Sequence, residues 1–216
     1  MDELTLIQRI AVWILPVVFA ITVHEVAHGW VAKKYGDNTA SMLGRLTLNP
    51  LKHMDLFGTL IIPGLLLISG TGLIFGWAKP VPVDPRYFKN PKKAMAVVAV
   101  AGPVSNLLMA IAWAMVVRIG VSLETEAVSL PLIYSGIAGI SINLVLALIN
   151  LLPIPPLDGS RILTGFLSHK WAWRYNKLER FGLVFMLALL WSGGLSYILG
   201  YPMYYAQQLF FSLAGL

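Results

Sequence analysis

The sequence contains no cysteine among its 216 residues, and only 12% of its residues are charged. The absence of cysteine excludes disulfide bonds and thiolate metal ligands, so a metal ion has to be held by histidine, aspartate or glutamate. A soluble domain has about 25% charged residues. The low charge here, together with 57% hydrophobic residues, leaves too little polar surface to cover a globule. We therefore expect an integral membrane protein.

The net charge of +6 is compatible with two kinds of partner. A basic protein can bind nucleic acid, but such binding needs a soluble basic face, and this sequence has none. The lysines and arginines instead lie on the connections between apolar segments, as they do in membrane proteins whose basic loops stay in the cytoplasm. We expect a lipid bilayer around the protein and no nucleic-acid partner.

Five segments of the sequence are almost entirely apolar: 5–32, 94–117, 130–152, 181–199 and 203–216. The first three are each long enough to cross about 30 Å of hydrocarbon as one helix. A further apolar segment, 56–78, is interrupted by Pro63 and several glycines. These residues disfavour one straight helix there.

The charges on the connections predict how the chain crosses the membrane. Basic residues dominate three connections: 33–34, 79–93 and 153–180. Connection 118–129 has one arginine against two glutamates. Because cytoplasmic loops are enriched in lysine and arginine, we expect the three basic connections in the cytoplasm and 118–129 outside. Segment 56–78 then enters and leaves the membrane on the same side, as a re-entrant or hairpin element.

The expected fold is an all-α integral membrane protein. It is a polytopic helical bundle of about five to six transmembrane segments, with the re-entrant or hairpin element between the first and third apolar segments. We expect residues 1–216 to form a single transmembrane domain. Its core covers residues 5–180, and residues 181–216 add C-terminal apolar segments.

The stretch ITVHEVAHGW, residues 21–30, places three ionisable side chains in an apolar span. On a helix His24 and His28 project from one face, and Glu25 lies close beside them. The H-E-x-x-H spacing lets two imidazoles share a zinc ion next to a glutamate that acts as a base. Two solvated histidines would be an equal alternative in a soluble helix. In hydrocarbon, unpaired polar groups are costly, which favours the metal site.

A catalytic zinc ion needs a third protein ligand and an open position. Asp158 lies in NLLPIPPLDGS at the end of segment 130–152, where three prolines prevent a regular helix. His24 is about 14 Å from the cytoplasmic end of its helix. A segment that dips back from that side can bring Asp158 to the same depth. The residues alone also allow a plain turn at Asp158 and Gly159.

Three motifs together resemble the site-2 protease family, peptidase family M50, of intramembrane zinc metalloproteases. They are HEVAH in the first span, AGPVSN at 101–106 and NLLPIPPLDG at 150–159, and the likeness covers residues 5–180. FGWAKPVPVDP at 75–85 further resembles a compact prokaryotic branch that lacks PDZ and CBS domains. The paired motifs, in this order and at this separation, are highly specific.

The resemblance implies one zinc ion per chain, held by His24, His28 and Asp158, with Glu25 as the general base. It implies hydrolysis of peptide bonds in transmembrane protein or peptide substrates near the cytoplasmic face. Such cleavage serves regulated intramembrane proteolysis or the clearance of signal-peptide remnants. The expected location is a prokaryotic plasma or inner membrane, with a multi-pass chain and the active site toward the cytoplasm. The pattern specifies no oligomeric state.

Three asparagines in the apolar segments leave alternatives open. The resemblance suggests that Asn106 faces the site and donates to the oxyanion or to the substrate backbone, but an interhelical hydrogen bond explains it equally well. Asn150 either orients the proline-rich loop or acts beside the site. For Asn143 we expect a contact between helices.

The alternative function is a membrane metal-ion transporter or channel that uses the same His/His/Asp site. Transporters commonly have two repeated halves with corresponding broken helices, and the sequence shows no such repeat. Glu25 also favours the protease, because a transit site does not need a base beside its ligands.

Overall fold

The computed structural model describes residues 5–62, 65 and 76–216, and these residues contain helices and irregular connections but no β-strand. The expected all-α class is therefore confirmed. The elements, in chain order, are α1 (Leu6–Lys34), α2 (Thr39–Met42), η1 (Pro50–Lys52), η2 (Leu56–Ile61), η3 (Pro85–Tyr87), α4 (Pro91–Val121), α5 (Glu126–Leu151), α6 (Asp158–Phe166), α7 (His169–Asn176), α8 (Glu179–Trp191) and α9 (Gly194–Ala214).

Three helices of the described residues, α1, α4 and α5, are long and apolar enough to cross a membrane. Helices α8 and α9 pass the same test only as a pair, and they meet at a bend of 75°. The described part of the chain therefore provides three candidate spans, or four with the bent pair. This is fewer than the five to six expected from the sequence, because the two C-terminal apolar segments form one bent pair.

The start of each long helix follows from its capping residues. Thr5 and Gln8 form a reciprocal capping box at the beginning of α1, in which each side chain accepts a hydrogen bond from the other residue's backbone N–H. Helix α4 begins at Pro91, directly after Asn90, whose side chain accepts from the backbone N–H of Lys93. These caps satisfy backbone donors that the helices themselves leave unpaired.

Small residues allow α4 and α5 to pack closely against each other. A Cβ atom added at Gly136 would lie 2.4 Å from Cγ2 of Val117, and one added at Gly139 would lie 2.3 Å from the ring of Trp113. Such close packing drives helix association in lipid, where burial of apolar surface contributes little. Helix α9 adds Phe210 to the same buried cluster.

The predicted re-entrant or hairpin element agrees with the hydrogen bonds at its two ends. The backbone N–H of Trp77 donates to the carbonyl of Gly58 over 3.0 Å, and that of Lys79 donates to the carbonyl of His53 over 2.9 Å. Residues 77–79 thus lie beside residues 53–58, so the two ends of the element are adjacent. Residues 63–64 and 66–75 of this element lie outside the described residues.

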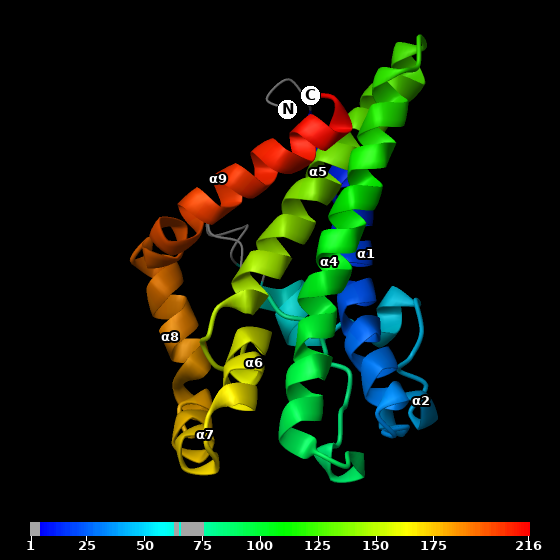
Figure 1. Cartoon of the computed structure of the whole chain (residues 1–216). Helices are drawn as coiled ribbons and strands as arrows, with labels where there is room; N and C mark the ends of the chain where they lie inside the picture. Colours follow the sequence, from blue (N-terminus) through cyan, green and yellow to red (C-terminus); the bar gives the residue numbers. More distant parts are fainter. Residues whose placement is uncertain (1–4, 63–64, 66–75) are drawn as a thin grey trace.

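The connections with many basic residues lie at one end of the molecule. Helices α2, α6 and α7 and the connection before α4 lie at this end, and the connection between α4 and α5 lies at the other (Figure 1). Helix α6 packs mainly on α4. This arrangement matches the prediction from the loop charges that the basic connections lie on one side of the membrane and connection 118–129 on the other.

Candidate metal centre

His24, His28 and Asp158 converge at one point between α1, α4 and α6. The Nε2 atoms of the two histidines are 3.0 Å apart, and each lies 3.2 Å from Oδ2 of Asp158. The histidines lie one turn apart on α1, whereas Asp158 is the first residue of α6. The structure therefore brings together the three ligand residues expected from the sequence, and their ligand atoms are close enough to hold one metal ion.

The second nitrogen of each imidazole has a partner that accepts a hydrogen bond. Nδ1 of His24 lies 2.6 Å from Oδ1 of Asn106, and Nδ1 of His28 lies 2.7 Å from the carbonyl oxygen of Val98. The amide nitrogen of Asn106 donates elsewhere, so its oxygen faces His24. Both Nδ1 atoms therefore have the hydrogen, and both Nε2 atoms direct a lone pair toward Asp158.

This donor set fits a zinc ion. Two imidazole nitrogens and one carboxylate oxygen are ordinary zinc ligands, and at bond lengths of about 2.0–2.1 Å a tetrahedral arrangement separates them by about 3.4 Å. The observed separations of 3.0 and 3.2 Å are close to this value. Oδ2 of Asp158 is buried and has no hydrogen-bond donor among the described residues. Three lone pairs at such distances repel one another unless a cation lies between them.

Gly102 lets α4 lie directly against the two imidazole rings. A Cβ atom at this position would lie 2.5 Å from Cε1 of His24 and 2.5 Å from Nε2 of His28. No side chain larger than hydrogen fits there unless the rings move. The AGPVSN motif did not predict this role of its glycine, although a glycine within a long apolar helix is itself an indication of close approach.

Glu25 lies beside the three ligands and is held by the chain that follows the re-entrant element. Its Oε2 atom accepts a hydrogen bond of 2.7 Å from the backbone N–H of Val81. Val81 is buried, and its Cγ1 atom lies 2.8 Å from the position of a Cβ added at Gly29, one turn after Glu25 on α1. A carboxylate has two oxygens, and this hydrogen bond uses only one of them.

Arg45, which no sequence motif marks as a site residue, holds the two residues just before Val81. Its Nη2 atom donates to the carbonyl oxygens of Lys79 and Pro80 at 2.9 and 3.4 Å. At the end of the stretch, the N–H of Asp84 donates to Oδ2 of Asp37 over 2.7 Å. Hydrogen bonds from Arg86 lower the pKa of the partly buried Asp84 carboxyl.

The three asparagines occupy different positions relative to the site. Asn106 is fully buried and donates to the carbonyl of Ala20 and to Oδ1 of Asn143, while its oxygen faces His24. Asn150 donates to the carbonyl of Leu146 within its own helix. Asn143 makes the expected contact between helices. A direct contact of Asn106 or Asn150 with substrate or oxyanion stays a prediction.

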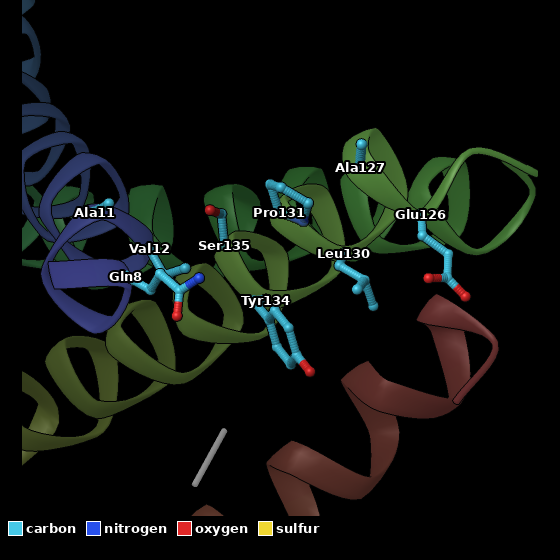
Figure 2. Close-up of a pocket in the computed structure, with 9 residues that line it drawn as sticks. All are labelled: Gln8, Ala11, Val12, Glu126, Ala127, Leu130, Pro131, Tyr134 and Ser135. Atoms are coloured by element: carbon cyan, nitrogen blue, oxygen red, sulfur yellow. The ribbon is translucent and has the colours of Figure 1, made fainter. Parts of the chain in front are cut away.

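A separate pocket of about 350 Å³ lies between the first turns of α1 and of α5 (Figure 2). Gln8 and Val12 line it from α1, and Leu130 and Tyr134 line it from α5. Gln8 is about 24 Å from His24 along the helix axis. This pocket therefore does not belong to the metal centre.

The chain belongs to peptidase family M50, whose profile matches residues 12–129 and 119–193. It is 42% identical over 193 residues to the "Putative zinc metalloprotease YwhC" of Bacillus subtilis, which covers 88% of this chain and 84% of that relative. It is 29% identical over 194 residues to the "Putative zinc metalloprotease Rip2" of Mycolicibacterium smegmatis, which covers 88% of this chain and 71% of the relative. No solved structure matches the chain.

This membership confirms the resemblance to the site-2 proteases. The protein is a zinc metalloprotease. Its long apolar helices make it a multi-pass membrane protein. Membership of this membrane protease family implies membrane-embedded substrates. The relatives are named as zinc metalloproteases, and His24, His28 and Asp158 lie close enough together to hold one metal ion.

Proposed function

We propose that the protein is an intramembrane zinc endopeptidase in which His24, His28 and Asp158 hold the metal and Glu25 is the general base. The observation that carries this proposal is the convergence of two Nε2 lone pairs and one carboxylate oxygen within 3.2 Å. The three atoms come from two separate elements inside a bundle of apolar helices. A site-2 protease needs this combination of ligands and burial.

When bound at this site, zinc supplies a Lewis acid that polarises the scissile carbonyl and increases the acidity of water. Glu25 takes the proton from the attacking water and returns it to the leaving amine. The hydrogen bond from Val81 to Oε2 holds the carboxylate in place and leaves Oε1 to accept that proton. His24 and His28 keep their Nδ1 hydrogens throughout, because Asn106 and Val98 accept them.

The proposed substrates are transmembrane segments that are cleaved near the cytoplasmic face, either in regulated proteolysis or in the clearance of signal-peptide remnants. Two observations support the position of the cut. His24 lies about 14 Å along the helix axis from Lys33, which with Lys34 ends α1. The connections that are rich in basic residues also lie at this end of the molecule (Figure 1).

We also propose a prokaryotic plasma or inner membrane as the location, and residues 1–216 as one protease domain. The bacterial relatives support the location, and the profile match from residue 12 to residue 193 supports the single domain. A metal-ion transporter that uses the same ligands is disfavoured, because the family consists of peptidases and Glu25 has no role in transit.

The experiment is a comparison of the wild-type protein with Glu25→Gln after purification in detergent. Glutamine keeps the size of the side chain and an oxygen that accepts from Val81, but it cannot take a proton from water. We expect about one zinc ion per chain in both proteins and cleavage of a model transmembrane substrate by the wild type only. Equal cleavage by both proteins would refute the proposal. Mass spectrometry of the products then locates the cleaved bond relative to the cytoplasmic end of the substrate.

A further inference from the structure

A continuous line of hydrogen bonds runs from α5 through α4 to the histidine on α1. The amide nitrogen of Asn143 donates to the carbonyl of Gly139 over 2.8 Å. The amide nitrogen of Asn106 donates to Oδ1 of Asn143 over 2.9 Å, and Oδ1 of Asn106 lies 2.6 Å from Nδ1 of His24. Both asparagines are 0% exposed, and His24 is buried as well. Neither asparagine side chain is therefore open to bulk water.

The direction of every bond in this line follows from its first acceptor. The carbonyl of Gly139 can only accept, so the nitrogen of Asn143 faces it and the oxygen of Asn143 faces α4. Asn106 must then present its nitrogen to Asn143 and its oxygen to His24. The imidazole consequently has its hydrogen on Nδ1, and Nε2 keeps the lone pair that faces Asp158.

The opposite orientation of Asn106 would leave buried acceptors facing one another. Its oxygen would then lie against the carbonyl oxygen of Ala20 and against Oδ1 of Asn143, neither of which has a hydrogen to donate. A buried polar group without a partner is costly, and linked hydrogen bonds reinforce one another. Asn143 thus supplies the shorter of the two hydrogen bonds that orient Asn106, at 2.9 Å, beside the 3.2 Å contact with Ala20.

We propose that Asn143 is a positioning residue of the metal centre. Acting through Asn106, it holds His24 in the tautomer and ring orientation that present Nε2 to the metal. The proposal rests on the proposed function of His24 as a zinc ligand, and it assigns Asn143 more than the contact between helices expected from the sequence. Partners that orient a metal-bound histidine typically change metal affinity by 10- to 100-fold when they are removed.

Two substitutions of Asn143 separate this role from simple packing. Asn143→Leu keeps the approximate volume but removes the oxygen that accepts from Asn106. Asn143→Asp keeps that acceptor and replaces the amide donor to Gly139 with a carboxyl oxygen. The matched control is Ser129→Ala, because Ser129 is buried on α5 and its hydroxyl donates to the carbonyl of Gly120 on α4 over 2.8 Å, away from the ligands.

The measurement is the zinc dissociation constant of the purified protein in competition with a chelator, together with the visible absorption spectrum of the Co²⁺-substituted protein. We expect Asn143→Leu to weaken zinc binding about tenfold or more and to change the Co²⁺ spectrum. Asn143→Asp should stay within about threefold of the wild type, and Ser129→Ala should match it, because both keep the acceptor for Asn106. Wild-type affinity in Asn143→Leu, or an equal loss in Ser129→Ala, would overturn the proposal.

A second measurement needs no folded variant of Asn143. Nitrogen-15 histidine NMR of the zinc-loaded wild-type protein reports which ring nitrogen of His24 has the hydrogen and which binds the metal. We expect Nδ1–H, and an Nε2–H tautomer would overturn the proposal. A wild-type protein that binds no zinc would overturn this proposal and the proposed function together. Zinc binding with an unaffected Asn143→Leu variant would overturn only this one.

Discussion

The backbone N–H of Val81 donates a hydrogen bond of 2.7 Å to Oε2 of Glu25. This contact joins the HExxH helix to the stretch that follows the re-entrant element. Because Arg45 holds the carbonyls just before Val81, the stretch is fixed on both sides. The orientation of the proposed base therefore depends on chain that is distant in the sequence.

Replacement of Val81 by proline tests this dependence. Val81→Pro removes the N–H but keeps an apolar side chain against α1, so Glu25 loses the hydrogen bond that orients it. We expect kcat for a transmembrane substrate to fall about tenfold or more, with zinc content unchanged because no ligand is touched. Val81→Ala keeps the N–H and should retain most of the activity. Equal losses in the two variants would show that packing against Gly29, and not the hydrogen bond, is what matters.

Gly102→Ala should displace the proposed metal ligands His24 and His28. The added Cβ would lie 2.5 Å from atoms of both His24 and His28, so the rings or α4 must shift. We expect loss of most bound zinc and of cleavage. Gly200→Ala is the control, because Gly200 lies within α9 and a Cβ there meets no atom within 4 Å. That variant should keep its zinc and gain up to about 1 kcal/mol of helix stability. Full zinc occupancy in Gly102→Ala would show that the two rings can move aside for the added Cβ and still bind the metal.

Local spacing explains which parts of the site the sequence predicts. His24 and His28 share a helix face by their separation alone, so the pair and Glu25 follow from the sequence pattern. Asp158 needed the family resemblance, because its distance from His24 depends on how α6 packs on α4. The role of Gly102 was missed for the same reason, since it depends on which helices touch.

The fold shows the same division between local and tertiary effects. The three long spans follow from apolar length, and α1, α4 and α5 confirm them. The bend between α8 and α9 was missed. It lies at Gly193, whose φ of 73° is a left-handed conformation that glycine adopts without strain. The Ser-Gly-Gly sequence at this point was an available indication.

Removal of zinc should destabilise the protein. With zinc at about 100 times its dissociation constant, binding contributes about 2.7 kcal/mol. For a chain of this size that corresponds to a Tm shift of about 5–10 °C. We therefore expect a chelator to lower the Tm of the wild type in detergent by this amount. Glu25→Gln should show the same shift, because Glu25 is not a proposed ligand. Asp158→Asn should show little or none, and a full shift in that variant would remove Asp158 from the ligand set.

Asp37 should stabilise the connections at the basic end of the molecule, because its carboxylate is 1% exposed and accepts the backbone N–H groups of both Thr39 and Asp84. Asp37→Ala leaves two donors without a partner, and each costs about 1–3 kcal/mol when buried. We expect a clear fall in Tm and, since Asp84 closely follows Val81, a lower kcat. Asp37→Asn keeps one acceptor oxygen and should lose about half as much stability. If Asp37→Ala were as stable as the wild type, water would be satisfying both donors, and Asp37 would not hold this stretch against α1.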